Sequence, residues 1–321
     1  MRRAESATIV LLSMSGLVGC TFLPFLVRAL NGTRRIYVIL QQICIMSYLL
    51  SLLLYFLILH QPLYEFSQSI SYSTINDGND FGASMLNLLI ERKVFTLFQS
   101  FFQYCFYFLS FLLSWDVYKM ITDPFKYSEF TKMRNVINRI FTGIGICFFL
   151  VSENFIYMVA AALIFTDPKE YLIDFTFRWK YARISRYIEI FSLVKFIALK
   201  IALTVVIIWI AVKTKLALKE SAAMSPDKNK LSAHRRLFYF TLIPLGINVL
   251  NLVPEALDAA SPLPQLYNHH STESIIMRTD VRICITAVTA TIGSFSYDLA
   301  FPILFPKVRS SMSCLKDVNE K

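Results

Sequence analysis

Seven long apolar stretches constrain this chain more than any other feature of its sequence. Each is 21 to 26 residues long, and together they make up half of the 321 residues. A helix needs about 20 mostly apolar residues to cross about 30 Å of hydrocarbon, at about 1.5 Å per residue. The stretches occupy residues 7–27, 36–59, 94–115, 140–165, 190–212, 237–257 and 281–305. They predict an all-α membrane protein, with a seven-helix transmembrane domain over 7–305, a short leading segment, 1–6, and a tail, 306–321.

The composition supports this class. Hydrophobic residues make up 55% of the chain and charged residues only 17%, whereas a soluble domain has roughly a quarter charged residues. None of the seven stretches alternates as a membrane β-strand does, so a barrel is excluded. Arg2 and Arg3 precede the first stretch as in a signal peptide, but 7–27 is longer than the apolar part of such a peptide, roughly 7 to 15 residues. We therefore interpret it as the first span.

The net charge of +10 indicates how the predicted spans are oriented in the membrane. The segments 28–35, 116–139, 213–236 and 306–321 carry 19 Lys and Arg residues, and the segments on the other side carry 10. Cytoplasmic loops are the ones enriched in Lys and Arg, so we expect the amino terminus outside and the carboxyl terminus in the cytoplasm. The positive charge then indicates a basic inner face suited to anionic lipid headgroups, and no nucleic-acid partner.

The end of the third stretch carries a motif. Asp116, Val117 and Tyr118 close the stretch, and a Pro-Phe-Lys-Tyr segment begins at Pro124. This spacing resembles that of rhodopsin-like G-protein-coupled receptors, which have Asp-Arg-Tyr at this place, followed by Ile, Pro, a large apolar residue and Tyr. The matching residues are Asp116, Tyr118, Ile121, Pro124, Phe125 and Tyr127. The resemblance implies that Pro124, Phe125 and Tyr127 contact a heterotrimeric G protein. A polar helix end followed by a proline stop is the alternative interpretation.

The chain also departs from that family. Val117 replaces the arginine of the family's ionic latch, and Lys119 is the candidate substitute. The second stretch has no Asp for the family's sodium site, and the cysteines of the usual outer disulfide are missing. So divergent a pattern, with 28 Phe, is similar to the nematode serpentine chemoreceptors. This resemblance implies a plasma-membrane receptor, with a sensory cilium as a candidate location, and a small extracellular ligand such as an odorant or pheromone.

Two prolines within apolar stretches are candidate switch positions. Pro302 lies in a Phe-Pro-Ile-Leu-Phe segment that resembles the family's Asn-Pro-x-x-Tyr, and Pro244 lies in the sixth stretch. A proline removes one backbone hydrogen bond and bends the helix. Pro244 is interpreted as a hinge for the inner end of its helix, with a static kink as the alternative, and a static kink is also the alternative at Pro302.

Charged residues inside the apolar stretches form a second group of candidates. Glu153 and Lys200 both lie about 15 to 18 Å below the outer helix ends, and a charge at such a depth is paired or hydrated. We therefore expect an ion pair between Glu153 and Lys200, which either fixes packing or lines a ligand cavity. Asp298, in the seventh stretch, is expected to be hydrogen-bonded near the Pro302 kink. The alternative function is a transporter or channel whose polar path passes Glu153, Lys200 and Asp298.

Nothing in the chain predicts catalysis. The sequence has no His-Glu-x-x-His or Cys-x-x-Cys pattern, no phosphate-binding glycine loop and no nucleophile elbow. We therefore expect neither an enzyme nor a metal or cofactor site. Cys314 lies in the basic tail and is a candidate for palmitoylation, with an unmodified thiol as the alternative.

Overall fold

The computed structural model describes residues 2–29, 33–60, 78–165, 175–224, 228–253 and 271–305. Within these ranges the chain is almost entirely helical and has no strand. The elements are α1 (Arg2–Ala29), α2 (Thr33–Leu54), a π-helical turn η1 (Tyr55–His60), α4 (Gly78–Thr122), α5 (Pro124–Phe130), α6 (Met133–Phe165), α7 (Phe175–Met224), α8 (Lys228–Leu250) and α10 (Ser271–Leu304). The expected all-α class is thus confirmed for the part of the chain that the structure describes.

Six helices in the described ranges are long and apolar enough to cross a membrane. Their apolar windows are Ala7–Pro24, Arg34–Ile58, Val94–Thr122, Met133–Glu153, Val194–Ala223 and Ile285–Leu304. These windows correspond to six of the seven predicted spans and make this a membrane protein. The remaining prediction, 237–257, falls partly on α8, and its last residues, 254–257, lie outside the described residues.

Several helices extend beyond the apolar stretches from which they were predicted, and α4 and α7 do so furthest. α4 begins at Gly78 instead of residue 94, and α7 begins at Phe175 instead of residue 190. Hydropathy marks only the part of a helix that lies in hydrocarbon. A helix satisfies its own backbone hydrogen bonds in water as well, so polar residues can continue it past the membrane boundary.

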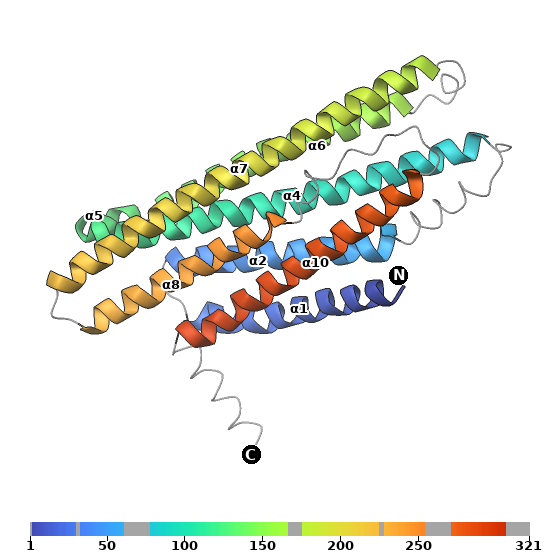
Figure 1. Ribbon diagram of the computed structural model, residues 1–321. Helices are drawn as coiled ribbons and strands as arrows, with labels where there is room; N and C mark the ends of the chain where they lie inside the picture. Colours follow the sequence, from blue (N-terminus) through green and yellow to red (C-terminus); the bar gives the residue numbers. More distant parts are fainter. Residues whose placement is uncertain are drawn as a thin grey trace.

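The helices lie alongside one another around α4 (Figure 1). α4 contacts α2, α6, α7 and α8, while α1 contacts both α2 and α10, and α8 contacts α7 and α10. The end of α1, the start of α2, α5, the end of α7, the start of α8 and the end of α10 lie together at the left of Figure 1, opposite the start of α1. We call this the α5 end of the bundle. It gathers the helix ends that adjoin the four basic segments.

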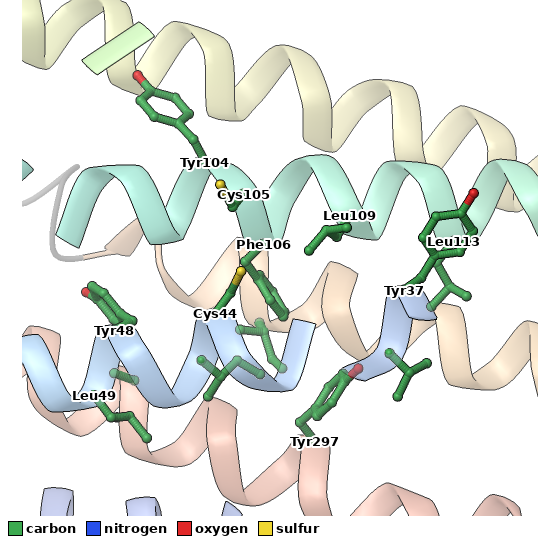
Figure 2. Close-up of a cluster of buried hydrophobic side chains, with 14 of the residues drawn as sticks. Tyr37, Cys44, Tyr48, Leu49, Tyr104, Cys105, Phe106, Leu109, Leu113 and Tyr297 are labelled. Atoms are coloured by element: carbon green, nitrogen blue, oxygen red, sulfur yellow. The ribbon is translucent and has the colours of Figure 1, made fainter. Parts of the chain in front are cut away.

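The core joins α2 and α4 to their neighbours through large side chains. Figure 2 shows Phe106 and Leu109 of α4 on the side of that helix that faces α2. Leu49 of α2 and Tyr297 of α10 lie between those two helices. Near the end of α10, the ring of Phe240 on α8 lies 5.6 Å from that of Tyr297 and 4.9 Å from that of Phe301. In contrast, Phe148 and Phe149 of α6 are 64% and 76% exposed. In a membrane protein such side chains face lipid.

Both prolines named in the sequence lie inside helices. Pro244 is within α8 and Pro302 is within α10, near its last turn. Because proline has no N–H, Pro302 leaves the carbonyl of Asp298 without its helical donor. The helix nevertheless continues, and the N–H of Phe305 donates to the carbonyl of Phe301 at 2.8 Å.

Gly143 of α6 provides a test of this packing. A Cβ atom at this position would overlap the ring of Phe108 on α4, whereas one at Gly145 would meet nothing within 4 Å. Gly143→Ala should therefore lower the free energy of unfolding by about 1–3 kcal/mol, measured by thermal unfolding in detergent. The control, Gly145→Ala, should leave stability equal or slightly higher. Equal effects of the two substitutions would contradict the α4–α6 contact, and Phe108→Leu should rescue Gly143→Ala.

Candidate functional site

A buried carboxylate lies near the α5 end of the bundle. Asp116 of α4 is fully buried, and the hydroxyl of Tyr127 on α5 donates to its Oδ2 at 2.9 Å. Nε of Arg34, from the first turn of α2, lies 3.5 Å from the same oxygen. The other oxygen, Oδ1, has no hydrogen-bond partner among the described residues. Three helices are thus linked through one carboxylate, which we call the Asp116 cluster.

The break between α4 and α5 makes this cluster possible. Asp116 and Tyr127 are 11 residues apart, a distance of about 16 Å along one straight helix. α4 ends at Thr122, and α5 starts at Pro124, in the first-turn position where proline fits a helix best. The change of direction at Asp123 brings the Tyr127 ring back to Asp116. Burial raises the pKa of the Tyr127 hydroxyl, opposed by the nearby Arg34, so this group stays protonated and donates at neutral pH.

The cation beside Asp116 is not the predicted one. Val117 is buried, and Lys119, the expected substitute for the family's arginine, lies with Nζ 5.4 Å from the Trp115 ring. Lys119 forms no ion pair within the described part of the chain. Lys119 lies over the ring of Trp115 on its own helix, whereas Arg34 approaches Asp116 from α2. Arg34, which sequence reasoning missed, is thus the cation that pairs with Asp116. Lys119 as the substitute for the family's arginine stays a prediction.

The remaining residues of the motif are solvent-facing or packed on α4. Phe125 is 94% exposed, and Pro124 beside it is also exposed. The Tyr118 ring lies 5.5 Å from that of Trp115. A phenylalanine this exposed at a helix end has no packing role within the described residues.

The predicted ion pair between Glu153 and Lys200 is wrong, because Glu153 pairs with a different lysine of α7. Glu153 Oε1 lies 2.7 Å from Nζ of Lys195, which also donates to the carbonyl of Leu150 at 2.6 Å. Lys195 and Lys200 are five residues apart, which separates their side chains by about 140° around α7. Lys195 therefore reaches α6 while Lys200 faces α4. Hydropathy does not specify the direction in which each of these charges points.

Lys200 is held in the bundle core. Its side chain is fully buried, and Nζ donates to Oε1 of Gln103 on α4 at 2.8 Å. Two aromatic rings also face the ammonium group, with centroids at 3.7 Å for Phe196 and 5.4 Å for Tyr107. Both kinds of contact stabilise a cation inside a bundle.

A small cavity adjoins this region. It has a volume of about 20 Å³ and lies among α2, α4, α8 and α10, with apolar walls that include Cys44 and Phe102. Its polar lining residues are Gln103, Asn251 and Ser294. A cavity of this volume holds about one water molecule. Gln103 lines the cavity and also binds Lys200, whereas Glu153 does not line it, so the structure does not bring the two predicted charged residues to one cavity.

Asp298 takes part in a polar link between α2 and α10. Nε2 of Gln42 donates to Oδ1 of Asp298 at 2.9 Å. One residue earlier in both helices, the hydroxyl of Tyr297 donates to Oε1 of Gln41 at 2.7 Å. Sequence reasoning missed both glutamines, although two adjacent amides within an apolar stretch are a readable signal of interhelical hydrogen bonding.

Other sequence predictions are not tested by these contacts. Cys314 lies outside the described residues. Cys20, Cys44, Cys105 and Cys147 are free thiols. Among the described residues no group of three or more His, Cys, Asp or Glu side chains is arranged to hold a metal ion.

Comparison with known proteins adds no relationship. No protein-family model matches the chain, and no curated protein shows significant similarity to it. The functional argument therefore depends on the chain's own residues.

Removing the Tyr127 hydroxyl tests the Asp116 cluster. Tyr127→Phe should lower the free energy of unfolding by about 1–3 kcal/mol, because a buried carboxylate loses its donor. The measurement is thermal unfolding of the purified protein. Tyr118→Phe is the control, since that hydroxyl makes no hydrogen bond among the described residues. If both substitutions cost the same, the bond from Tyr127 contributes nothing.

A charge exchange tests the corrected ion pair. Glu153→Lys alone and Lys195→Glu alone each place like charges together, and each should lower the yield of folded protein about fivefold or more. The double exchange should restore most of the yield, measured by fluorescence-detected size exclusion. Glu153→Lys combined with Lys200→Glu is the matched control and should give no rescue. Rescue by Lys200→Glu instead would favour the original pairing.

Proposed function

We propose that this chain is a seven-span receptor of the plasma membrane that binds a small extracellular ligand within its bundle and activates a heterotrimeric G protein. In this proposal the α5 end faces the cytoplasm, and the predicted stretch 237–257, part of which is α8, is the seventh span. The basic segments adjoining the α5 end favour this orientation. The resemblance to serpentine chemoreceptors suggests an odorant or pheromone as the ligand.

The observation that carries the proposal is the coupling of a buried carboxylate to an exposed phenylalanine. Tyr127 holds α5 against Asp116, and the same seven-residue helix presents Phe125 at 94% exposure. A change in α4 or α2 that alters the Asp116 cluster therefore moves the surface that would bind a G protein. Exposed large aromatic side chains are favoured anchors at protein interfaces.

The cavity beside Gln103 is the proposed ligand site. It lies between helices, as small-molecule sites in bundles do. At about 20 Å³ it is too small for an odorant, so binding has to displace wall side chains such as Phe102. A ligand of this kind shifts the bundle only by its differential affinity for the closed and opened arrangements. Pro244 in α8 and Pro302 in α10 are the proposed points of bending.

A transporter or channel is the second candidate. It is favoured by the buried polar side chains inside the bundle, with Lys200 on Gln103 and Asp298 on Gln42. The Glu153–Lys195 pair contributes less to such a path, since both side chains are about one fifth exposed at the edge of the bundle. Nucleotide exchange on purified G proteins, measured beside solute uptake into vesicles containing the same protein, separates the two functions. Uptake without any stimulated exchange would overturn the receptor proposal.

Phe125 gives the sharpest mutational test. Phe125→Ala should lower ligand-stimulated nucleotide exchange at least about tenfold, because it removes the exposed anchor, while surface expression stays unchanged. Phe141→Ala, which truncates a phenylalanine that is 69% exposed on α6, is the matched control and should retain exchange. Full activity of Phe125→Ala would show that α5 does not contact the G protein.

A further inference from the structure

A hollow opens at the α5 end, between the end of α4, α5 and the start of α6. Its volume is about 360 Å³, which is within the size range of small-molecule sites. Tyr127 and Phe130 form aromatic walls, and four charged side chains lie around them. The charged residues are Lys119, Asp123, Lys126 and Glu129. Phe125 does not line this hollow, so the hollow and the exposed phenylalanine use different sides of α5.

The residues beside the hollow are of the kind found at a membrane surface. Trp115 and Tyr118 pack together near the end of α4, with ring centroids 5.5 Å apart. Trp and Tyr concentrate at the boundary between hydrocarbon and headgroups. Lys119 lies over the Trp115 ring, and the apolar window of α4 ends at Thr122. The group best placed to enter the hollow is therefore a lipid headgroup.

The charges around the hollow are largely available for a ligand. Within the described residues, neither Lys119 nor Lys126 forms an ion pair, and Asp123 makes no side-chain bond at the start of α5. Glu129 has only a loose contact with Lys132, at 3.7 Å with both side chains mostly exposed. Basic and acidic groups alternate along the chain at 119, 123, 126 and 129. This pattern suits a ligand with both negative and positive groups better than a simple anion.

We propose that the hollow binds an aminophospholipid headgroup, and specifically phosphatidylserine. Lys119 and Lys126 would bind the phosphate and the serine carboxylate, and Asp123 and Glu129 would accept hydrogen bonds from the ammonium group. The choice of phosphatidylserine rests on the proposed orientation, because this lipid contributes to the negative charge of the cytoplasmic leaflet. Phosphatidylethanolamine shares the phosphate and the ammonium but lacks the carboxylate.

Lipid retention by the full-length protein tests the proposal without a ligand or a G protein, so its failure is distinct from failure of the receptor function. The purified protein in detergent is mixed with equal amounts of phosphatidylserine, phosphatidylethanolamine, phosphatidylglycerol and phosphatidylcholine, and the retained lipid is counted by native mass spectrometry. We expect phosphatidylserine to be retained most and phosphatidylcholine least. Equal retention of phosphatidylcholine would overturn the site, and equal retention of phosphatidylethanolamine would overturn the choice of serine.

Matched variants locate the binding. K119A/K126A should weaken phosphatidylserine retention roughly tenfold, whereas K213A/K215A, which removes two exposed lysines of α7, should leave it nearly unchanged. Equal losses in the two variants would assign retention to general surface charge and overturn the proposal. If K119A/K126A does not fold, K126A is compared with K215A, since both positions are exposed.

The acidic side of the hollow is tested separately. D123N/E129Q should abolish the preference for phosphatidylserine over phosphatidylglycerol, because the latter has no ammonium group for these carboxylates to bind. An unchanged preference would overturn the role given to Asp123 and Glu129. Thermal unfolding of each variant checks that the bundle is intact.

Discussion

Two adjacent hydrogen bonds between α2 and α10 fix the centre of the bundle. Gln41 and Gln42 of α2 are fully buried, and they bind the consecutive residues Tyr297 and Asp298 of α10. An amide left unsatisfied in hydrocarbon costs several kcal/mol, so a shift of either helix by one residue would break both bonds at once. Gln41 also donates to Ser110 of α4 at 3.2 Å. The height and rotation of three helices are therefore set by hydrogen bonds between polar side chains.

α4 connects the two regions to which we assign function. Gln103 lines the cavity and binds Lys200, and Asp116 lies 13 residues further along the same helix, about 20 Å away. A rigid helix transmits translation and rotation over such a distance, because its backbone hydrogen bonds are made within the segment. The Asp116 cluster then converts a displacement of α4 or α2 into a displacement of α5. This is a physical route between a ligand in the bundle and a partner at the membrane surface.

The sequence was most informative where a property is summed over many residues. Hydropathy over about 20 positions located the spans, and the Lys and Arg count grouped the helix ends that lie at the α5 end. The sequence was least informative about the direction in which a side chain points and about the residue that it contacts. Arg34 and Asp116 are 82 positions apart in the sequence, so their contact depends on how α2 packs against α4. The partner of Glu153 depended on the rotation of α7, which hydropathy does not specify. The spacing of the α4 motif did anticipate that Asp116 and Tyr127 belong to one region, although not their hydrogen bond.

The link between α2 and α10 also has a consequence for biosynthesis. Helices enter the membrane in chain order, so α2 is in place well before its partners on α10 have been translated. During that interval Oε1 of Gln41 and Nε2 of Gln42, the two atoms that α10 will bind, have to remain hydrated or bind substitute groups. The early bundle is therefore incomplete until the last helix arrives, and a chain that stalls before α10 exposes two polar groups to lipid. Such exposure is a chemical signal by which a membrane quality-control system can distinguish an unfinished chain from a finished one.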